Sequence, residues 1–542
     1  MFARNLYLAD SLDELALLLE IEGANFFKVK AYKEAARTIR AFESPVRSVL
    51  QLENVKGIGP GIKKVIESIL SGAEPEEMIA LKKRIPAGIL EIARLPGLGP
   101  RSLKTLLENK ITDLKALEQR ARDHTLRKIP GFGAKTEYRI LTDLDLLQGY
   151  KDLFLGAEAL EVAKELQERL FEHSDVSRVE ITGELRRFEP LVSQIELLVE
   201  KRTDFAEKML LDSLGIITDA GQSRLKTGYP VKIHFSKITD KEFGTKLLQT
   251  TGPREFLTKF GEIPALDDEK EIFRQKSYNY LPPEIRHHKE AQRYLLKKLP
   301  DLIKLQDIRG DLHMHSCYSD GAVSILEMAL AAKQRGYKYI AITDHSQSLT
   351  VAYGLTPERL VEQKKEIQGL NCELDIKIFH GTEVDILKDG SLDFPDEVLK
   401  NLDFVIASVH SNFRQTKTEM TERIIRAMEN PYVKVIGHIS GRMLDKRPGY
   451  ELEWERILKE AKRTKTALEL NSTPNRLDVA EELLKSLVDS GVKLMINTDA
   501  HSIEGLDYVL WGVMTARRAL ISKDNIINTY SLQHITKWLA SK

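Results

Sequence analysis

Residues 310–321 read GDLHMHSCYSDG, a short apolar run that ends in two histidines and an aspartate. Side chains alternate between the two faces of a strand, so His313 and His315, two positions apart, can face the same ion. Asp320 follows shortly after them. Imidazole and carboxylate groups are ligands for zinc, manganese and iron. The stretch therefore predicts a strand whose carboxyl end carries metal ligands.

The same pattern recurs six times toward the C-terminus, each time as an apolar run followed by polar residues. The runs are YIAITDHS (Asp344, His345), IKIFHGTEVDI (Glu383), FVIASVHSN (His410), VKVIGHISGR (His438, Arg442), ALELNSTPNR (Asn471, Arg476) and KLMINTDAHS (Asp499, His501). Helical patterns such as ILEMALAAKQRG lie between them. Continuous apolar strands are typical of parallel sheets, and parallel barrels gather function at the carboxyl ends of their strands. The pattern predicts a distorted (β/α)7 barrel over residues 308–542.

The polar strand ends hold an unusual concentration of metal-binding side chains. Of the 13 histidines in the chain, six fall there with two aspartates and a glutamate. A lone buried histidine is usually a hydrogen-bonded core residue, and we interpret His380 and His534 that way. Nine such residues at the ends of six strands favour a metal centre instead. The nine candidates are His313, His315, Asp320, His345, Glu383, His410, His438, Asp499 and His501.

The order of these elements, HxH, SDG, TDH, GxE, SxH, GH and DAH, resembles the PHP (polymerase and histidinol phosphatase) domain. The resemblance implies up to three divalent ions, Mn²⁺ or Zn²⁺, that share the nine residues. It implies one ion on His313, His315, Glu383 and Asp499, a second on Glu383, His410 and His438, and a third on Asp320, His345 and His501.

Clustered divalent ions would lower the pKa of a bound water and neutralise phosphate oxygens, which is the chemistry of metal-assisted phosphoester hydrolysis. Arg442 and Arg476 follow two of the same strands and could clamp the oxygens that are not attacked. A surface ion pair is the alternative interpretation of each arginine, and the sequence leaves both open.

The N-terminal 150 residues contain a short repeat in which an apolar residue lies between two glycines just before a helix. The copies are VKGIGPGIKK at 55–64, LPGLGPRSLK at 95–104 and IPGFGAKTEY at 129–138. Free N–H groups at a helix start suit a phosphate oxygen, and nearby cations attract a polyanion. The segments resemble helix-hairpin-helix motifs, which bind the DNA backbone without reading sequence. The alternative, that a copy is only a tight turn between helices, stays open.

The candidate DNA-contact residues in these repeats are glycines and nearby cations. They are Gly57, Gly59, Lys64, Gly97, Gly99, Arg101, Lys104, Gly131, Gly133 and Lys135.

The middle of the chain carries ITGELRRFEPLVSQIELLVE at 181–200, which resembles the signature of family X DNA polymerases. That family has Gly-Ser, paired arginines and Asp-x-Asp, with a third aspartate on a later strand. Gly183 and Arg186-Arg187 match, but Glu184 stands at the serine position. Gln194, Glu196 and His234 stand at the aspartate positions.

Magnesium prefers hard anionic oxygens in a near-octahedral array. An amide, one carboxylate and an imidazole supply too few of them. We therefore expect a nucleotidyltransferase-like α+β palm domain over 151–295 that keeps its fold but does not polymerise.

The chain as a whole has 542 residues, 42% of them hydrophobic, which excludes a mostly disordered protein. The chain has only two cysteines, and its 81 basic residues balance its 81 acidic residues. The sequence shows no signal peptide and no apolar run long enough to span a membrane. We therefore expect a cytoplasmic protein. Pro282-Pro283 marks a connector, and the charged stretch after it is expected to be helical.

The domain order predicted for this multidomain chain is an α-helical helix-hairpin-helix region (1–150), the palm-like domain and the barrel. It is similar to that of bacterial family X DNA polymerases with a C-terminal PHP domain. The resemblance implies a DNA-repair 3′–5′ exonuclease or an enzyme that processes abasic ends, bound to DNA and not to membranes. A working repair polymerase with proofreading and a phosphatase of small molecules are the alternatives.

Overall fold

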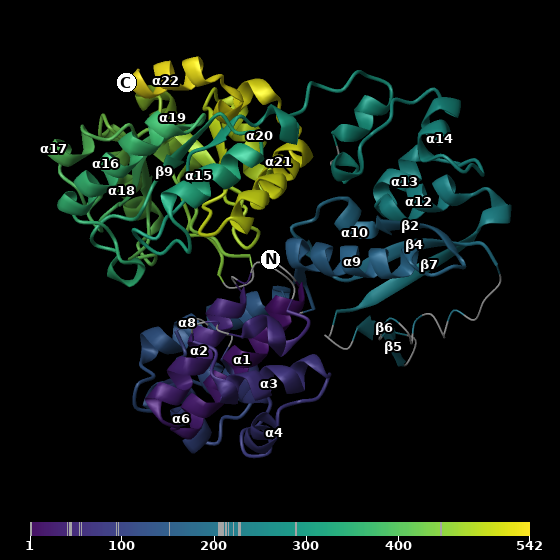
Figure 1. The fold of residues 1–542 in the computed structure, drawn as a ribbon, viewed down its shortest axis with the longest axis horizontal. Coiled ribbons are helices and arrows are strands. Elements are labelled where there is room, and N and C mark those ends of the chain that lie inside the picture. The colour runs from purple at the N-terminus through teal and green to yellow at the C-terminus, as the bar shows by residue number, and fades with distance from the viewer. Residues whose placement is uncertain are drawn as a thin grey trace. The chain divides into compact units, whose positions relative to one another are not determined.

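The structure is a computed structural model, and it divides the chain into two compact units, residues 1–153 with 445–448 and residues 154–444 with 449–542 (Figure 1). It describes residues 3–40, 42, 46–53, 55, 57–93, 95, 97–150, 152–203, 207, 211, 214, 216–219, 222–225, 229–287, 290–444 and 447–541. Within these ranges, no helix combines the length and the apolar character that a bilayer crossing requires.

The first unit is helical. Its helices are α1 (Ala3–Glu22), α2 (Phe26–Arg40), α3 (Pro60–Leu70), α4 (Glu76–Lys82), α5 (Gly88–Ile92), α6 (Pro100–Glu108), α7 (Leu114–Arg122) and α8 (Ala134–Tyr150). Helices α3 and α6 both begin with a proline, whose fixed φ suits the first turn of a helix. A glycine precedes each of these prolines, so the repeat seen in the sequence sets where these two helices start.

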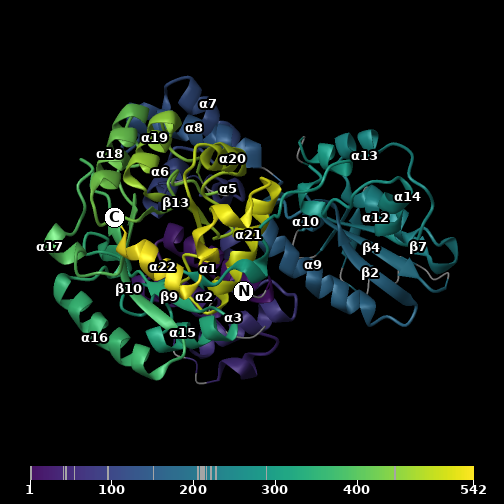
Figure 2. The same ribbon diagram turned by 90° about the horizontal axis from the view of Figure 1, so that it is seen from above.

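The second unit begins with a mixed α/β part, whose elements alternate along the chain. They are β1 (Phe154–Leu155), α9 (Gly156–Phe171), β2 (Val176–Thr182), α10 (Gly183–Arg186), β3 (Leu191–Val192), β4 (Ile195–Lys201), β5 (Ile216–Asp219), β6 (Gln222–Leu225), β7 (Val231–Lys237), α12 (Phe243–Thr251), α13 (Arg254–Phe260) and α14 (Glu269–Gln275). Strand β4 lies between β2, which is antiparallel to it, and β7, which is parallel to it (Figure 2). The predicted palm-like sheet is therefore present.

The rest of the second unit alternates strand and helix. The elements are β8 (Gly310–Asp311), α15 (Ile325–Gln334), β9 (Tyr339–Ile342), α16 (Pro357–Glu373), β10 (Lys377–Asp385), α17 (Asp396–Leu399), β11 (Phe404–Ser408), α18 (Lys417–Glu429), β12 (Val435–Ile436), α19 (Trp454–Thr464), β13 (Ala467–Asn471), α20 (Glu481–Asp489), β14 (Leu494–Asn497), α21 (Val509–Arg518) and α22 (Leu532–Ala540).

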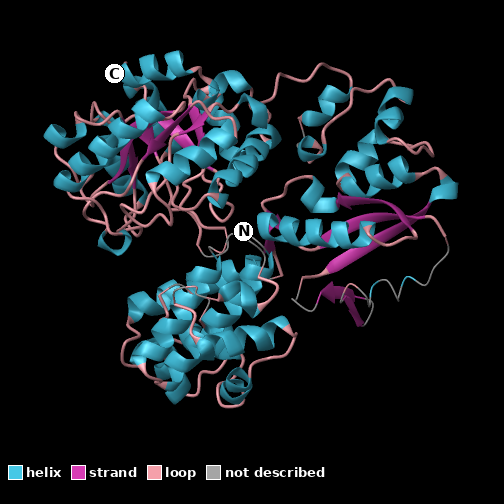
Figure 3. Cartoon of the chain, in the orientation of Figure 1, coloured by secondary structure: helices cyan, strands magenta, loops and turns pink. Residues whose placement is uncertain are grey.

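Strands β8 to β14 pair in sequence order, all parallel, and helices surround them (Figure 3). A further parallel bridge between Met314 and Ala500 joins the two edges of this sheet just beyond the strand ends. The predicted seven-stranded barrel is confirmed in this nearly closed form. All seven strands run in one direction, so the residues that follow them meet at one rim.

The charged stretch after Pro282-Pro283 differs from its prediction. Within the described part of residues 283–307 the structure has only short 3-10 turns, at Pro283–Ile285, Ala291–Leu295 and Leu305–Asp307. Pro300 sets the C-terminal limit of any helix here, because proline cannot continue a helix.

His380 lies on β10 and is a core residue, as predicted, whereas His534 on α22 is exposed, so that prediction is wrong. His380 is 3% exposed, and neither ring nitrogen has a hydrogen-bond partner. Burial lowers the pKa of His380 to about 4, although the charge of Asp403 opposes this. The neutral ring is therefore the form that the folded barrel accepts.

We expect the barrel to lose stability as the pH falls, in a way that His380→Leu removes. The folded pKa lies below that of the unfolded chain, so this contribution is complete above pH 6.5 and disappears as the pH falls toward 4. At pH 4.5 the loss should be about 2.5 kcal/mol in the wild type. Urea unfolding followed by tryptophan fluorescence measures it, because Trp454, Trp511 and Trp538 all lie in the barrel. Equal pH dependence in both proteins would contradict the assignment.

Candidate functional site

The nine predicted metal ligands converge at the carboxyl rim of the barrel. Three groups of side chains place their ligand atoms within 4.8 Å of one another. The groups are His315, Asp320, His345 and His501; His313, His315 and Asp499; and His345, Glu383 and His410. His438 joins the third group, with its Nε2 2.9 Å from Glu383 Oε1. The predicted set of nine thus lies together, while the allocation of residues to individual ions stays a prediction.

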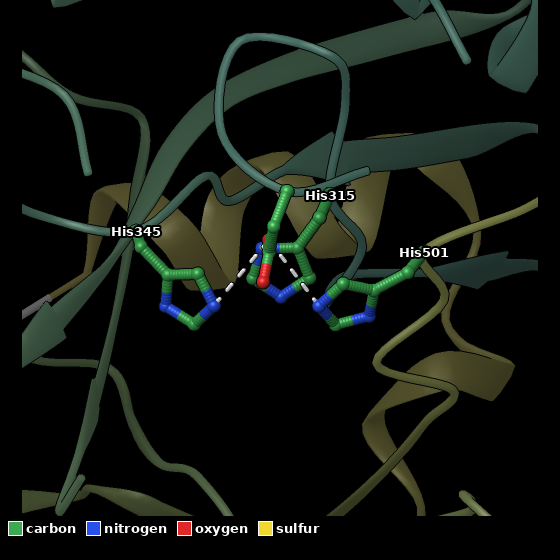
Figure 4. Close-up of side chains that lie close together, drawn as sticks. His315, His345 and His501 are labelled. Carbon is green, nitrogen blue, oxygen red and sulfur yellow. Dashed lines mark ion pairs between the residues drawn. The ribbon is translucent and has the colours of Figure 1, made fainter. Parts of the chain in front are cut away.

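His315 and His345 lie between these groups. The ring of His315 stacks on those of His345 and His501, with centroids 4.4 Å and 4.2 Å away, and Figure 4 shows the three rings gathered around one point. Asp320 Oδ1 lies 3.6 Å from His345 Nε2 and 3.3 Å from His501 Nε2. Ligand atoms about 3.4 Å apart are what a tetrahedral ion with bonds near 2.1 Å requires.

Buried ligand atoms without hydrogen-bond partners support metal binding. These atoms include His313 Nε2, His315 Nδ1, His345 Nδ1, Glu383 Oε2 and His438 Nδ1. His345 Nδ1 and Glu383 Oε2 lie 2.9 Å apart, but they do not meet the geometry of a hydrogen bond. Buried polar atoms normally have partners, and each exception needs a physical reason. Because the nitrogen-rich donor set suits a transition metal, these residues fit divalent ions.

Ion pairing among the predicted ligands balances much of the charge in this cluster. Burial by itself would raise the pKa of Glu383, but the surrounding imidazoles, His410 first, hold that pKa well below its usual range. The opposite balance raises the pKa of His410 to about 10 and that of His501 to about 9, because their carboxylate neighbours outweigh burial. Burial and neighbouring histidines lower the pKa of His315 to about 3.

Two carboxylates that the sequence analysis missed orient ligand histidines. Glu469 is fully buried on β13, and its Oε1 accepts a hydrogen bond from His313 Nδ1 at 2.7 Å. Asp385 at the end of β10 does the same for His410 Nδ1, at 2.6 Å. Each bond leaves the ring's Nε2 free to face the centre. The sequence does contain a sign of both residues. Each is an acidic residue inside an otherwise apolar run, Glu469 in ALELN and Asp385 in EVDIL.

Backbone strain also collects at this rim. His438 and Asp499 both have positive φ, 24° and 54°, although neither is glycine. Such conformations persist where the surrounding structure enforces them, and they concentrate at functional sites. Gly321 closes the first loop against His315, since a Cβ at position 321 would lie 2.4 Å from the His315 carbonyl oxygen.

The two candidate arginines occupy different positions. Arg476 places Nε 3.7 Å from Asp499 Oδ2 and is thus beside the ligands. Arg442 instead donates from Nε to the Arg476 carbonyl oxygen, at 2.8 Å, and from Nη2 to that of Leu477. Arg442 therefore braces the segment that carries Arg476.

Comparison with known proteins places this geometry in a family. Family models match as a PHP domain over residues 311–473, a helix-hairpin-helix domain over 3–74 and a SAM-like helix-hairpin-helix tandem over 89–145. The chain is 34% identical to the DNA polymerase/3′-5′ exonuclease PolX of Bacillus subtilis (strain 168), over 97% of this chain and 98% of that protein. The chain belongs to the PolX family.

Shorter relatives match the barrel region alone. A probable phosphatase of Caldicellulosiruptor bescii is 33% identical over 35% of this chain and 79% of its own length. A probable phosphatase of Thermoanaerobacter sp. (strain X514) is 31% identical over 40% of this chain and 89% of its own length. The PHP barrel thus occurs in relatives without the N-terminal and middle parts.

The residues at the polymerase positions are brought together in the palm-like part of the chain. His234 on β7 places Nε2 2.9 Å from Glu196 Oε2 on β4, and the Gln194 side chain also hydrogen-bonds to Glu196. Burial would raise the pKa of Glu196, but these partners, His234 first, lower it. The Glu196 carboxylate therefore already has hydrogen-bond partners within the protein.

The neighbouring signature residues are also held by protein contacts. Glu184 Oε2 accepts hydrogen bonds from Ser193 N at 2.6 Å and from its Oγ at 2.9 Å. Arg186 forms a two-pronged pair with Glu269, at 2.9 and 2.8 Å. Arg187 donates to the Thr251 carbonyl oxygen at 2.7 Å. Both arginines of the signature thus serve the fold.

The three glycine repeats of the first unit share one arrangement. The apolar residue between the glycines is buried, whereas all ten candidate DNA-contact residues are exposed. The first glycine of each copy, Gly57, Gly97 and Gly131, has φ between 74° and 89°, which L side chains rarely adopt. The second copy differs, because Arg139 Nη2 lies 3.3 Å from the Gly97 carbonyl oxygen and a Cβ at position 97 would meet its guanidinium.

We expect Glu469→Gln to weaken Mn²⁺ binding by about 10- to 100-fold, because a neutral partner no longer fixes the His313 ring. Calorimetric titration of the full chain with Mn²⁺ measures the change. Glu482→Gln, an exposed acid on α20, is the matched control and should bind as the wild type does. An unchanged affinity in Glu469→Gln, with the metal-free variant folded by circular dichroism, would contradict the role.

Proposed function

We propose that this protein is a metal-dependent nuclease that removes nucleotides from the 3′ ends of DNA, with abasic ends among its substrates. Its helix-hairpin-helix region holds the DNA backbone, and its palm-like domain does not polymerise. The observation that carries the proposal is the convergence of nine imidazole and carboxylate ligands at the barrel rim of a PolX-family chain.

We propose Mn²⁺ or Zn²⁺ as the bound ions, up to three in number, since both accept mixed nitrogen and oxygen ligands. Bound there, such ions would supply hydroxide near neutral pH and neutralise the scissile phosphate. The protein's own part is orientation: Glu469 and Asp385 fix the rings of His313 and His410. Arg476 offers a planar donor next to Asp499 for a phosphate oxygen, and Arg442 holds its backbone.

Three contacts support an inactive polymerase site. Magnesium requires several anionic oxygens, and the carboxylate that remains, Glu196, is paired with His234. Glu184 places a further negative charge where the triphosphate would bind in the family, and Ser193 holds that carboxylate there. Arg186 would have to break its buried pair with Glu269 before it could bind a nucleotide phosphate.

The exposed glycine repeats support the DNA-holding role. A Cβ at Gly59, Gly99, Gly131 or Gly133 would have no atom within 4 Å, so these turns are open to a ligand's backbone. With Lys64, Arg101, Lys104 and Lys135 exposed nearby, the surface suits a sequence-independent polyanion.

The probable phosphatases that match the barrel favour a second candidate function, phosphatase action on a small molecule. A phosphatase of that kind has no use for backbone-tracking hairpins, so DNA is the preferred substrate. Release of phosphate from histidinol phosphate together with no degradation of DNA would reverse this preference.

Incubation of a 3′-recessed duplex and an abasic duplex with the protein and Mn²⁺ should shorten the strands from the 3′ end. His313→Ala and Glu383→Ala should each reduce this rate by at least about 10³-fold, because each removes a ligand at the core of the centre. Denaturing gels measure the products, with Glu482→Gln as the control. Full activity in both variants would locate the chemistry elsewhere.

The Glu383→Ala protein also tests the inactive polymerase site. Without degradation, any extended primer would accumulate, so a primer–template supplied with Mg²⁺ and all four nucleotides should remain at its original length. Primer extension by this variant would contradict the proposal and favour a repair polymerase with proofreading.

A further inference from the structure

We propose that Tyr353 is a stacking platform for the base at the 3′ end of a DNA strand whose terminal phosphodiester lies in the metal centre. The proposal rests on the nuclease function and adds a residue that selects nucleotide substrates.

The loop that carries Tyr353 starts at the metal centre. It joins β9 to α16 and begins directly after the ligand His345. Leu355 N donates to the His345 carbonyl oxygen at 2.7 Å, so the loop returns to the ligand that it left. Tyr353 is two residues from Leu355, which limits the separation of their Cα atoms to about 7 Å.

The loop is also fixed to the outer carboxylates of the site. Ser348 Oγ donates to Asp385 Oδ2 at 2.9 Å, and Asp385 is the carboxylate that orients His410. Ser348 N donates to Asp393 Oδ2 at 2.7 Å. The position of Tyr353 relative to the ligands is therefore set by hydrogen bonds at both ends of the loop.

Arg359 on α16 links this loop to the one that carries Asp320. Its Nη1 donates to the Tyr353 carbonyl oxygen at 2.9 Å, and its Nη2 donates to that of Tyr318. Tyr318 is two residues before Asp320. One guanidinium thus links the backbone of Tyr353 to the loop that carries Asp320.

Tyr353 itself is arranged for contact with a ligand. Its side chain is 69% exposed, and its φ of 57° is a left-handed conformation that suits glycine or asparagine better than tyrosine. Val351, on the same loop, is 85% exposed. An aromatic side chain that is mostly exposed gains little from burial, and strained residues concentrate at ligand sites.

A nucleobase is the ligand whose chemistry fits. Every base presents a flat π face, so stacking on one aromatic side chain tolerates any sequence, which a 3′-end nuclease requires. The phosphodiester in the centre brings the terminal base to the rim where Tyr353 lies. A protein partner would use Val351 and Tyr353 together, independently of DNA.

Two measurements test the platform. In the Zn²⁺-loaded full chain, 2-aminopurine at the 3′ terminus of an oligonucleotide should be quenched on binding when the last linkage is a 3′-methylenephosphonate, which cannot be hydrolysed. Tyr353→Asn should abolish this quenching, while Tyr353→Phe keeps it. Asparagine suits the left-handed backbone, so the loop keeps its shape. With Mn²⁺, the ratio of the specificity constant for single-stranded DNA to that for bis(p-nitrophenyl) phosphate, a base-free diester, should fall about tenfold in Tyr353→Asn, through KM.

Val361→Ala, an exposed side chain on α16, is the control and should behave as the wild type in both measurements. Quenching and a rate ratio that survive in Tyr353→Asn would overturn the platform. A wild-type protein that hydrolyses neither diester would overturn the nuclease function instead, while the quenching still reports on Tyr353. The label can also be placed inside the strand. If Tyr353→Asn then reduces the 2-aminopurine quenching as much as it does for a terminal label, Tyr353 contacts DNA in general and its 3′-end role is overturned.

Discussion

The Glu383 carboxylate, buried among histidines, is the interaction on which the rest of this barrel depends. It is 1% exposed, and its oxygens lie 2.9 to 3.7 Å from nitrogens of five imidazoles. An isolated charge in such a place would be very costly, so it must be matched by protons or by metal. The neighbouring rings can match it only if their orientations are fixed, and the hydrogen bonds from His313 to Glu469 and from His410 to Asp385 fix two of them. The barrel supplies the remaining condition by bringing seven strand ends to one rim.

In the palm-like domain, by contrast, the charged side chains of the signature are paired with other protein groups. Its remaining carboxylate, Glu196, is matched by His234 on the adjacent strand, and its arginines are matched by Glu269 and by backbone carbonyl oxygens. These protein contacts support our proposal that the site does not bind magnesium and a triphosphate productively. The two sites thus differ in whether their buried polar atoms still lack partners. At the barrel rim, several buried nitrogen and oxygen atoms of the candidate ligands lack hydrogen-bond partners, so these atoms are available to a bound ion.

Much of this follows from residue order alone. Apolar runs that each end in polar residues predict a parallel barrel, because only parallel strands bring all such ends to one side. Glycines around a buried apolar residue likewise predict turns at Gly57, Gly97 and Gly131. The connector after Pro283 was predicted wrongly as a helix, since local charge patterning does not show whether a segment packs as a helix, and packing supplies most of a helix's stability. Glu469 and Asp385 were missed because they lie inside apolar runs, where a lone acid gives no indication of its partner.

The sequence by itself determined which chemical groups this protein brings to each site: nine imidazole and carboxylate side chains at the strand ends, an amide and an imidazole at the polymerase positions, and cations beside the glycine turns. Side-chain chemistry and strand periodicity are properties of the chain, and they do not change on folding. Only the tertiary structure decided which groups share partners, that Arg442 braces Arg476 while Arg476 faces the ligands, and that one guanidinium, Arg359, holds two rim loops together. Those relations join residues tens to hundreds of positions apart, and their distances are set by packing, which sequence spacing does not encode.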